Sequence, residues 1–317
     1  MLDKALGSWR GRHVLIIGGQ RTVRFAQVLL EELGASAAIM APEFHAQSLC
    51  RAMTAHRVAA VIVPHMQELC RAGDSPSACL SRLQMLLDEA REAGVPLVML
   101  ATDAGVYRAQ SRPAREDDPI GGETREGLIQ SLFSLYADGT SRSLFGDPVN
   151  TLIVHHMPCL SSDAPSVKQY TRWCTALLRG EVVPVEHPAM QGAFAHPLEI
   201  AHGVLTLGAM CLSLSRGGTY NLALEPPCLL PNRTAAQRLI ARVGGNRPIH
   251  ESEPPLFPPV QALDGARAKA FCGAACRLPA EESLSMLFEL MRAEHLGEAQ
   301  AQAVLREQAQ RVLEGMR

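Results

Sequence analysis

Short apolar runs alternate with amphipathic helical segments along the first third of the chain, and this alternation restricts the fold more than any other feature. The apolar runs occupy residues 14–18, 35–41, 58–64 and 96–103. The helical segments occupy residues 24–34, 47–56 and 80–95. Strands that alternate with helices form parallel sheets, and continuous apolar strands are buried on both faces. The sequence therefore predicts an α/β fold, with a doubly wound parallel sheet covered by helices on both sides.

A loop, a helix and a strand follow this repeat. Residues 108–123 are polar and punctuated by Pro and Gly, which indicates a loop at the strand ends. Apolar periodicity predicts a helix over residues 124–137, and a further apolar run predicts a strand over residues 150–158.

Beyond residue 158 the purely apolar strands become fewer and the prolines more frequent. Residues 196–210 and 217–224 indicate short αβ pieces, and residues 281–317 are helical and charged. We therefore expect a second, smaller α/β lobe that is partly interleaved with the first domain. The expected divisions are a sheet domain over residues 1–165, the smaller lobe over 166–291 and a C-terminal helical extension over 292–317.

The composition favours a globular protein that binds neither nucleic acid nor a membrane. The 317 residues carry a formal net charge of -2, which offers no general attraction for polyanions. The first residues lack the cationic flank and apolar stretch of a secretory signal, and no run approaches the roughly 20 apolar residues that span a bilayer. We therefore expect a cytoplasmic protein. Its nine cysteines, scattered without a tight framework, indicate reduced thiols.

The cysteine and histidine spacings predict no metal site. Cys272 and Cys276 form the only close cysteine pair, and without a second pair this spacing indicates packing on one helix face. Four histidines lie in or beside the predicted segments of the second half: His155, His156, His196 and His202. Their spacing imposes no common coordination sphere, so core or loop histidines are expected. The sequence also lacks the GxSxG turn of serine hydrolases.

Several pieces, in this order, resemble the extended short-chain dehydrogenase/reductase family, which includes the NAD-dependent nucleotide-sugar epimerases, dehydratases and reductases. LQMLLDEAREAGVPLVMLATDAGVY, at residues 83–107, is similar to the family's helix, strand and SSxxVYG turn, and EDDPIGG resembles the loop before its catalytic helix. The other pieces are TLIVHHMPCL, FAHPLEIAHGVL, GGTYNLAL, ALDGARAKAFCG and LPAEESLSMLFEL. The resemblance covers residues 13 to about 291. It implies a Rossmann-type N-terminal domain that binds NAD or NADP, a lobe that binds a nucleotide sugar, and a homodimer.

The implied cofactor turn follows the first predicted strand. In the family's GxxGxxG pattern the first glycine falls on Gly18, beside Gly19, while the next two positions hold Arg21 and Arg24. A side chain at the second position projects into the space that a pyrophosphate needs. The turn therefore either binds a nucleotide through its arginines and the helix N-terminus, or serves as a structural turn. The acid that would bind the ribose is missing too, since the nearest carboxylate, Glu43, follows a proline.

The resemblance also implies a catalytic tyrosine with a lysine four residues later, which this chain lacks. Its tyrosines are Tyr107, Tyr136, Tyr170 and Tyr220, and its lysines are Lys4, Lys168 and Lys269. Alignment with the family places Glu126 at the tyrosine position, Gln130 at the lysine, Asp103 at the Ser/Thr position and His155 at a substrate-binding arginine. Two interpretations of these carboxylates remain open. In the first, Asp103 and Glu126 form an acid–base pair in the cleft; in the second, Glu126 is a solvated carboxylate at the start of a helix.

Two functional hypotheses result. The first is a divergent family member that keeps the architecture, lacks standard hydride transfer, and binds a nucleotide or nucleotide sugar or serves as a regulatory or partner subunit. The second is an active nucleotide-sugar-modifying enzyme that uses NAD or NADP with Asp103, Glu126 and His155 as acid–base groups. Convergence of those three side chains in one cleft beside Gly18 would favour the second hypothesis.

Overall fold

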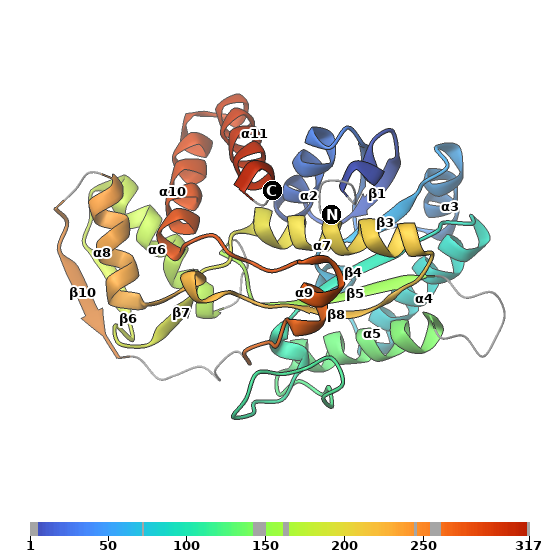
Figure 1. Ribbon diagram of the computed structural model, residues 1–317, viewed down its shortest axis with the longest axis horizontal. Helices are drawn as coiled ribbons and strands as arrows, with labels where there is room; N and C mark the ends of the chain where they lie inside the picture. The colour runs from blue at the N-terminus through green and yellow to red at the C-terminus, as the bar shows by residue number, and fades with distance from the viewer. Residues whose placement is uncertain are drawn as a thin grey trace.

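A parallel sheet of six strands forms the centre of the protein, in the order β2-β1-β3-β4-β5-β8 (Figure 1). The computed structural model describes residues 6–71, 73–141, 150–160, 165–243, 246–253 and 261–315. The strands are β1 (His13–Ile17), β2 (Ser36–Met40), β3 (Ala60–Val63), β4 (Val98–Asp103), β5 (Thr151–His156) and β8 (Gly218–Leu222). Strand order runs outward from β1 in both directions, so the doubly wound α/β fold is confirmed.

Helices cover both faces of this sheet (Figure 1). One face holds α2 (Gln20–Glu32), α7 (Pro197–Leu214) and α11 (Glu298–Gly315), and the other holds α3 (Ala46–Ala55), α4 (Pro76–Glu92) and α5 (Arg125–Ser141). Successive side chains of β1 enter opposite cores: Val14 packs with the first group of helices and Leu15 with the second. The continuous apolar run of this strand is therefore explained by burial on both sides.

Helix α7 differs from the short αβ piece expected at residues 196–210. It is one helix of 18 residues, enclosed by the sheet, α2 and α11. A helix buried on nearly every side carries apolar residues all round, so its sequence shows little of the periodicity that marks a surface helix. Among the described residues, α7 is the one helix long and apolar enough to cross a membrane, and 72% of that stretch is buried inside the molecule.

The smaller lobe has a separate apolar core. Its helices are α6 (Pro165–Arg179), α8 (Asn232–Val243) and α10 (Ala280–Leu296). Its strands pair as β6 (Val183–Glu186) with β10 (Ile249–Ser252), and β7 (Gln191–Ala193) with β9 (Leu229–Pro231). Between these segments the chain returns to the large sheet as α7, β8 and α9 (Ala266–Cys272), so the lobe is interleaved with the sheet domain.

The expectation that all cysteines are reduced is wrong for one pair, and the expected packing of Cys272 and Cys276 on one helix face is wrong too. Cys70 and Cys79 are paired as a disulfide with their Cα atoms 5.0 Å apart, because the turn after β3 lies against the first turn of α4. Cys272 and Cys276 do not share a helix face, because α9 ends at Cys272 and Gly273 leaves the helix in the left-handed region, with a φ of 76°.

Candidate functional site

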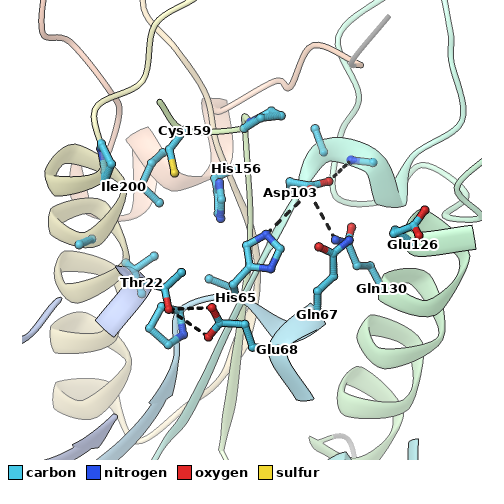
Figure 2. A pocket seen from close by; sticks show the side chains of 18 of the residues that line it. Thr22, His65, Gln67, Glu68, Asp103, Glu126, Gln130, His156, Cys159 and Ile200 are labelled. Atoms are coloured by element: carbon cyan, nitrogen blue, oxygen red, sulfur yellow. Dashed lines mark hydrogen bonds and ion pairs between the residues drawn. The ribbon is translucent and has the colours of Figure 1, made fainter. Parts of the chain in front are cut away.

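A cavity of about 1170 Å³ lies at the carboxyl ends of the central strands, between α2, α5 and α7. The order of the strands reverses between β1 and β3, and ligands of doubly wound sheets bind beside this reversal. Figure 2 shows part of the set of side chains that line the cavity.

The last residues of β4 and β5 place two polar side chains in the cavity. Asp103 and His156 are register partners, and partners in a parallel pair point to the same face of the sheet. Asp103 Oδ1 accepts a hydrogen bond from the Gly105 backbone nitrogen at 2.7 Å. Its Oδ2 lies 3.4 Å from Gln130 Nε2 and 3.9 Å from His65 Nε2 (Figure 2).

Helix α5 carries the two residues that the sequence alignment placed at the family's tyrosine and lysine positions. Glu126 and Gln130 are one helical turn apart, and both line the cavity. Gln130 is buried and reaches Asp103, whereas Glu126 is exposed at the rim. Asp103, Glu126 and Gln130 are thus brought to one cavity, where two carboxylates could exchange protons with a bound ligand.

His155, the fourth residue at a family position, does not line this cavity. It lies in the core on the α5 side of the sheet, where Nδ1 is 2.8 Å from the Tyr107 hydroxyl and Nε2 is 3.3 Å from Ser134 Oγ. The Tyr107 hydroxyl in turn donates to Asn221 Oδ1 at 2.9 Å. Burial lowers the pKa of His155 to about 4, so this imidazole is neutral at pH 7. Because side chains alternate along a strand, the next residue, His156, enters the cavity in its place.

A carboxylate from another part of the chain occupies the N-terminal end of α2. Glu68 belongs to the 3₁₀ turn η2 (Met66–Leu69), which directly follows β3. Its Oε2 accepts a hydrogen bond from the Gly19 backbone nitrogen at 2.8 Å, and the Thr22 hydroxyl lies 2.9 Å from Oε1 (Figure 2). A Cβ atom at Gly18 would lie 2.5 Å from Oε2. Glu68 therefore takes the position in which a helix N-terminus binds an anion.

The two arginines of the turn lie in different places. Arg21 is exposed and lines the cavity. Arg24 forms an ion pair of 2.6 Å with Glu294 of α10, and its guanidinium lies 4.8 Å from the centre of the Phe25 ring. Arg24 thus connects α2 to α10, and Arg21 is the one arginine of the pair that faces the cavity.

These residues do not fit the pyrophosphate of NAD or NADP. The Gly19 N–H and the Thr22 hydroxyl are already bound to Glu68, and a phosphate brought to them would meet a like charge. Arg21 stands where the second glycine would let the backbone approach the phosphates. The strand–helix turn of this chain is built around an internal anion.

Three residues of the cavity were not predicted from the sequence to be there: His65, Glu68 and His156, the last of which was expected to be a core or loop histidine. His65 and Glu68 belong to the stretch PHMQEL, which begins where β3 ends. Polar residues that follow a central strand lie at the ligand-binding edge of a doubly wound sheet, so this stretch did contain a usable signal. Burial, with a smaller contribution from the neighbouring His65, lowers the pKa of His156 to about 4.

Within the ranges that the structure describes, no group of three or more His, Cys, Asp or Glu side chains is arranged to hold a metal ion. His196 instead caps the N-terminus of α7, where its Nδ1 accepts a hydrogen bond from the Leu198 backbone nitrogen at 3.2 Å.

No protein-family model and no curated protein matches the chain, but solved structures do. A dTDP-glucose 4,6-dehydratase from Streptomyces venezuelae, solved with NAD, matches over 91% of this chain and 99% of its own, with a TM-score of 0.69 and 17% identity. A UDP-glucose 4-epimerase from Stenotrophomonas maltophila, solved with NAD and formylated UDP-arabinopyranose, covers 89% of this chain and 99% of its own, with a TM-score of 0.69 and 16% identity.

A dTDP-glucose 4,6-dehydratase from Bacillus anthracis, solved with NAD, covers 92% of this chain and 100% of its own, with a TM-score of 0.70 and 11% identity. The chain has the fold of the extended short-chain dehydrogenase/reductases. The resemblance inferred from the order of the motifs is therefore confirmed at the level of the fold.

Proposed function

We propose that this protein is a divergent member of the NAD-dependent epimerase/dehydratase family that binds a small molecule at the strand ends and has lost dinucleotide-dependent hydride transfer. The observation that carries this proposal is the Glu68 carboxylate, bound to the Gly19 N–H and lying against the Thr22 hydroxyl. Glu126 and Gln130 at the positions of the tyrosine and lysine support it, because neither can act as a tyrosinate base with its lysine. The protein would then act by binding, as a regulatory or partner subunit.

A nucleotide sugar is disfavoured as the ligand of this cavity. Its diphosphate would approach the carboxylates of Glu68, Asp103 and Glu126. Among the described residues that line the cavity, Arg21 is the one lysine or arginine available to offset the phosphate charge. The epimerase from Stenotrophomonas maltophila was solved with a UDP-sugar. Under this proposal, the present chain would differ from that epimerase both in its ligand and in its cofactor turn.

One observation favours an active enzyme as the second candidate. Asp103 and Glu126 line the same cavity, as an acid–base pair would require. That hypothesis also needs His155 as an acid–base group. Because His155 contacts Tyr107 in the core, it is missing from the cavity, and the predicted set of three acid–base groups is incomplete.

Native mass spectrometry of the full-length protein as purified tests the proposed function. We expect the mass of the protein without NAD or NADP, and no formation of NADH when NAD and UDP-glucose are added. A stoichiometric dinucleotide in the purified protein, together with NADH formation or conversion of the sugar, would show that it is a working dehydrogenase or epimerase.

We also propose that α5 pairs two copies of the chain. Leu128, Leu132 and Leu135 lie on one side of this helix and are 51%, 45% and 56% exposed. They line a second hollow, of about 520 Å³, together with Ile120. A continuous apolar surface of this kind is costly to leave in water and is typical of an interface.

Leu132→Glu is expected to weaken this homodimer at least a hundredfold, because a carboxylate would be buried without a partner, at a cost of about 3 kcal/mol. Analytical ultracentrifugation over a range of concentrations measures the dissociation constant. The control is Leu296→Glu, at a leucine that is 72% exposed at the end of α10. The homodimer proposal fails if the wild-type protein is a monomer throughout, or if Leu132→Glu and Leu296→Glu dimerise equally well.

A further inference from the structure

Three residues that carry hydrogen-bond acceptors, Asp103, Gln130 and His156, line the main cavity (Figure 2). His156 is 2% exposed, and its Nε2 has no hydrogen-bond partner among the described residues. Gln130 is 1% exposed, and its Oε1 likewise has no partner in the described part of the chain. Within the described ranges, the side-chain contacts of Asp103 Oδ2 are the long one of 3.4 Å with Gln130 Nε2 and the 3.9 Å approach of His65 Nε2.

Whether each of these atoms donates or accepts a hydrogen bond follows from the other contacts of its side chain. His156 Nδ1 lies 2.8 Å from the Met157 carbonyl oxygen, so Nδ1 carries the proton and Nε2 presents a lone pair. The Gln130 amide nitrogen faces the Asp103 carboxylate, which only accepts, so the amide oxygen is the unpartnered end. A buried acceptor without a donor is costly, and two of them, Gln130 Oε1 and His156 Nε2, belong to residues that line the same cavity as Asp103, where a ligand could donate to them.

The charge of the cavity points to the same kind of ligand. Four carboxylates line it: Glu68, Asp103, Glu123 and Glu126. Arg21, an exposed residue, is the one lysine or arginine in the described lining, and the imidazole of His65 can serve either as donor or as acceptor. A cleft lined mainly by one sign of charge concentrates ligands of the opposite sign.

We infer that the cavity binds an organic ligand through a primary ammonium group, held by Asp103 Oδ2, Gln130 Oε1 and His156 Nε2. An ammonium group has three N–H donors and no acceptor, which matches the three acceptor atoms Asp103 Oδ2, Gln130 Oε1 and His156 Nε2. Its positive charge would be offset by Asp103, and the remaining carboxylates would attract it into the cavity. This inference rests on the proposed function, in which the site no longer holds a dinucleotide.

The test compares diaminobutane with butanediol, which has the same carbon chain but carries hydroxyl groups in place of ammonium groups. We expect calorimetric titration of the full-length protein at neutral pH to show saturable binding of diaminobutane, at least about tenfold tighter than any binding of butanediol. Equal affinity for the two compounds, tighter binding of butanediol, or no binding of either would overturn the ammonium assignment.

Two variants test whether the ammonium group binds at this place in the cavity. Asp103→Asn keeps an oxygen for the Gly105 N–H while removing the charge, and we expect it to weaken diaminobutane binding at least about tenfold. Gln130→Met removes one acceptor at similar volume, and should weaken binding several-fold without loss of thermal stability, because no buried amide is left unpaired. Asp88→Asn, on the exposed face of α4, is the matched control. Unchanged affinity in both cavity variants would show that the amine binds elsewhere and would overturn the assignment.

A parallel titration with NAD separates this inference from the proposed function. Saturable NAD binding would contradict the proposed function whatever the amines do. Absence of binding by both NAD and diaminobutane would leave the proposed function standing and would refute the ammonium site alone.

Discussion

Glu68→Ala is expected to lower the free energy of unfolding by about 1–2 kcal/mol and to create an anion site that the wild-type protein lacks. The substitution removes the carboxylate that caps α2 and leaves the Gly19 N–H and the Thr22 hydroxyl without it. A helix N-terminus with free donors binds phosphate or sulfate. Inorganic phosphate should therefore restore part of the lost stability, by about 1.4 kcal/mol at ten times its dissociation constant.

Thermal unfolding with and without phosphate measures both effects of Glu68→Ala. The wild-type protein and the control variant Glu92→Ala, at an exposed residue of α4, should respond to phosphate only weakly and equally. The proposed role of Glu68 would be refuted if Glu68→Ala kept wild-type stability, or if phosphate stabilised all three proteins to the same extent.

Gly122→Ala is expected to lower the free energy of unfolding by about 3 kcal/mol or more. Gly122 lies where three backbone segments meet beside the cavity. A Cβ atom there would overlap the Gly105 carbonyl oxygen and lie 2.6 Å from Gly127 Cα. Backbone atoms cannot turn aside as a flexible side chain can, so the turn after Asp103 would have to separate from α5, which carries Gln130.

Chemical denaturation of Gly122→Ala, beside the same substitution at Gly139, measures this loss. Gly139 is exposed within α5, and a methyl group added there would meet no atom within 4 Å, so Gly139→Ala should raise stability by about 0.5–1 kcal/mol through helix propensity. A loss below about 1 kcal/mol for Gly122→Ala would mean that the three segments are not as closely packed as the structure indicates.

Strand and helix alternation was enough to predict the sheet and most of the helices around it, because each element has the periodicity of its own environment. Two elements escaped this reasoning. β2 was expected to be buried on both faces, but it is an edge strand, and Ile39 is 46% exposed there. Helix α7 is surrounded by the core, so the pattern that marks a helix with one wet face is missing from it.

The candidate site could be predicted only where a residue's neighbours in the sequence decide its position. Asp103 at the end of a strand and Gln130 on the following helix both reach the cavity. His155 was misplaced because a shift of one residue along a strand reverses the face to which a side chain points. The polar stretch after β3 could have placed Glu68 at the strand ends, but its contact with Gly19 spans 49 residues of sequence and is recorded in no local pattern.

The central claim is that Glu68 has replaced the phosphates of the dinucleotide at the start of α2. Calorimetric titration of the wild-type, full-length protein with NAD tests it most directly, since binding needs the donors that Glu68 occupies. We expect no saturable heat at millimolar NAD, with the Gly19–Glu68 contact intact. Saturable binding with a micromolar dissociation constant would contradict the account, because it would mean that Glu68 yields its position to the cofactor.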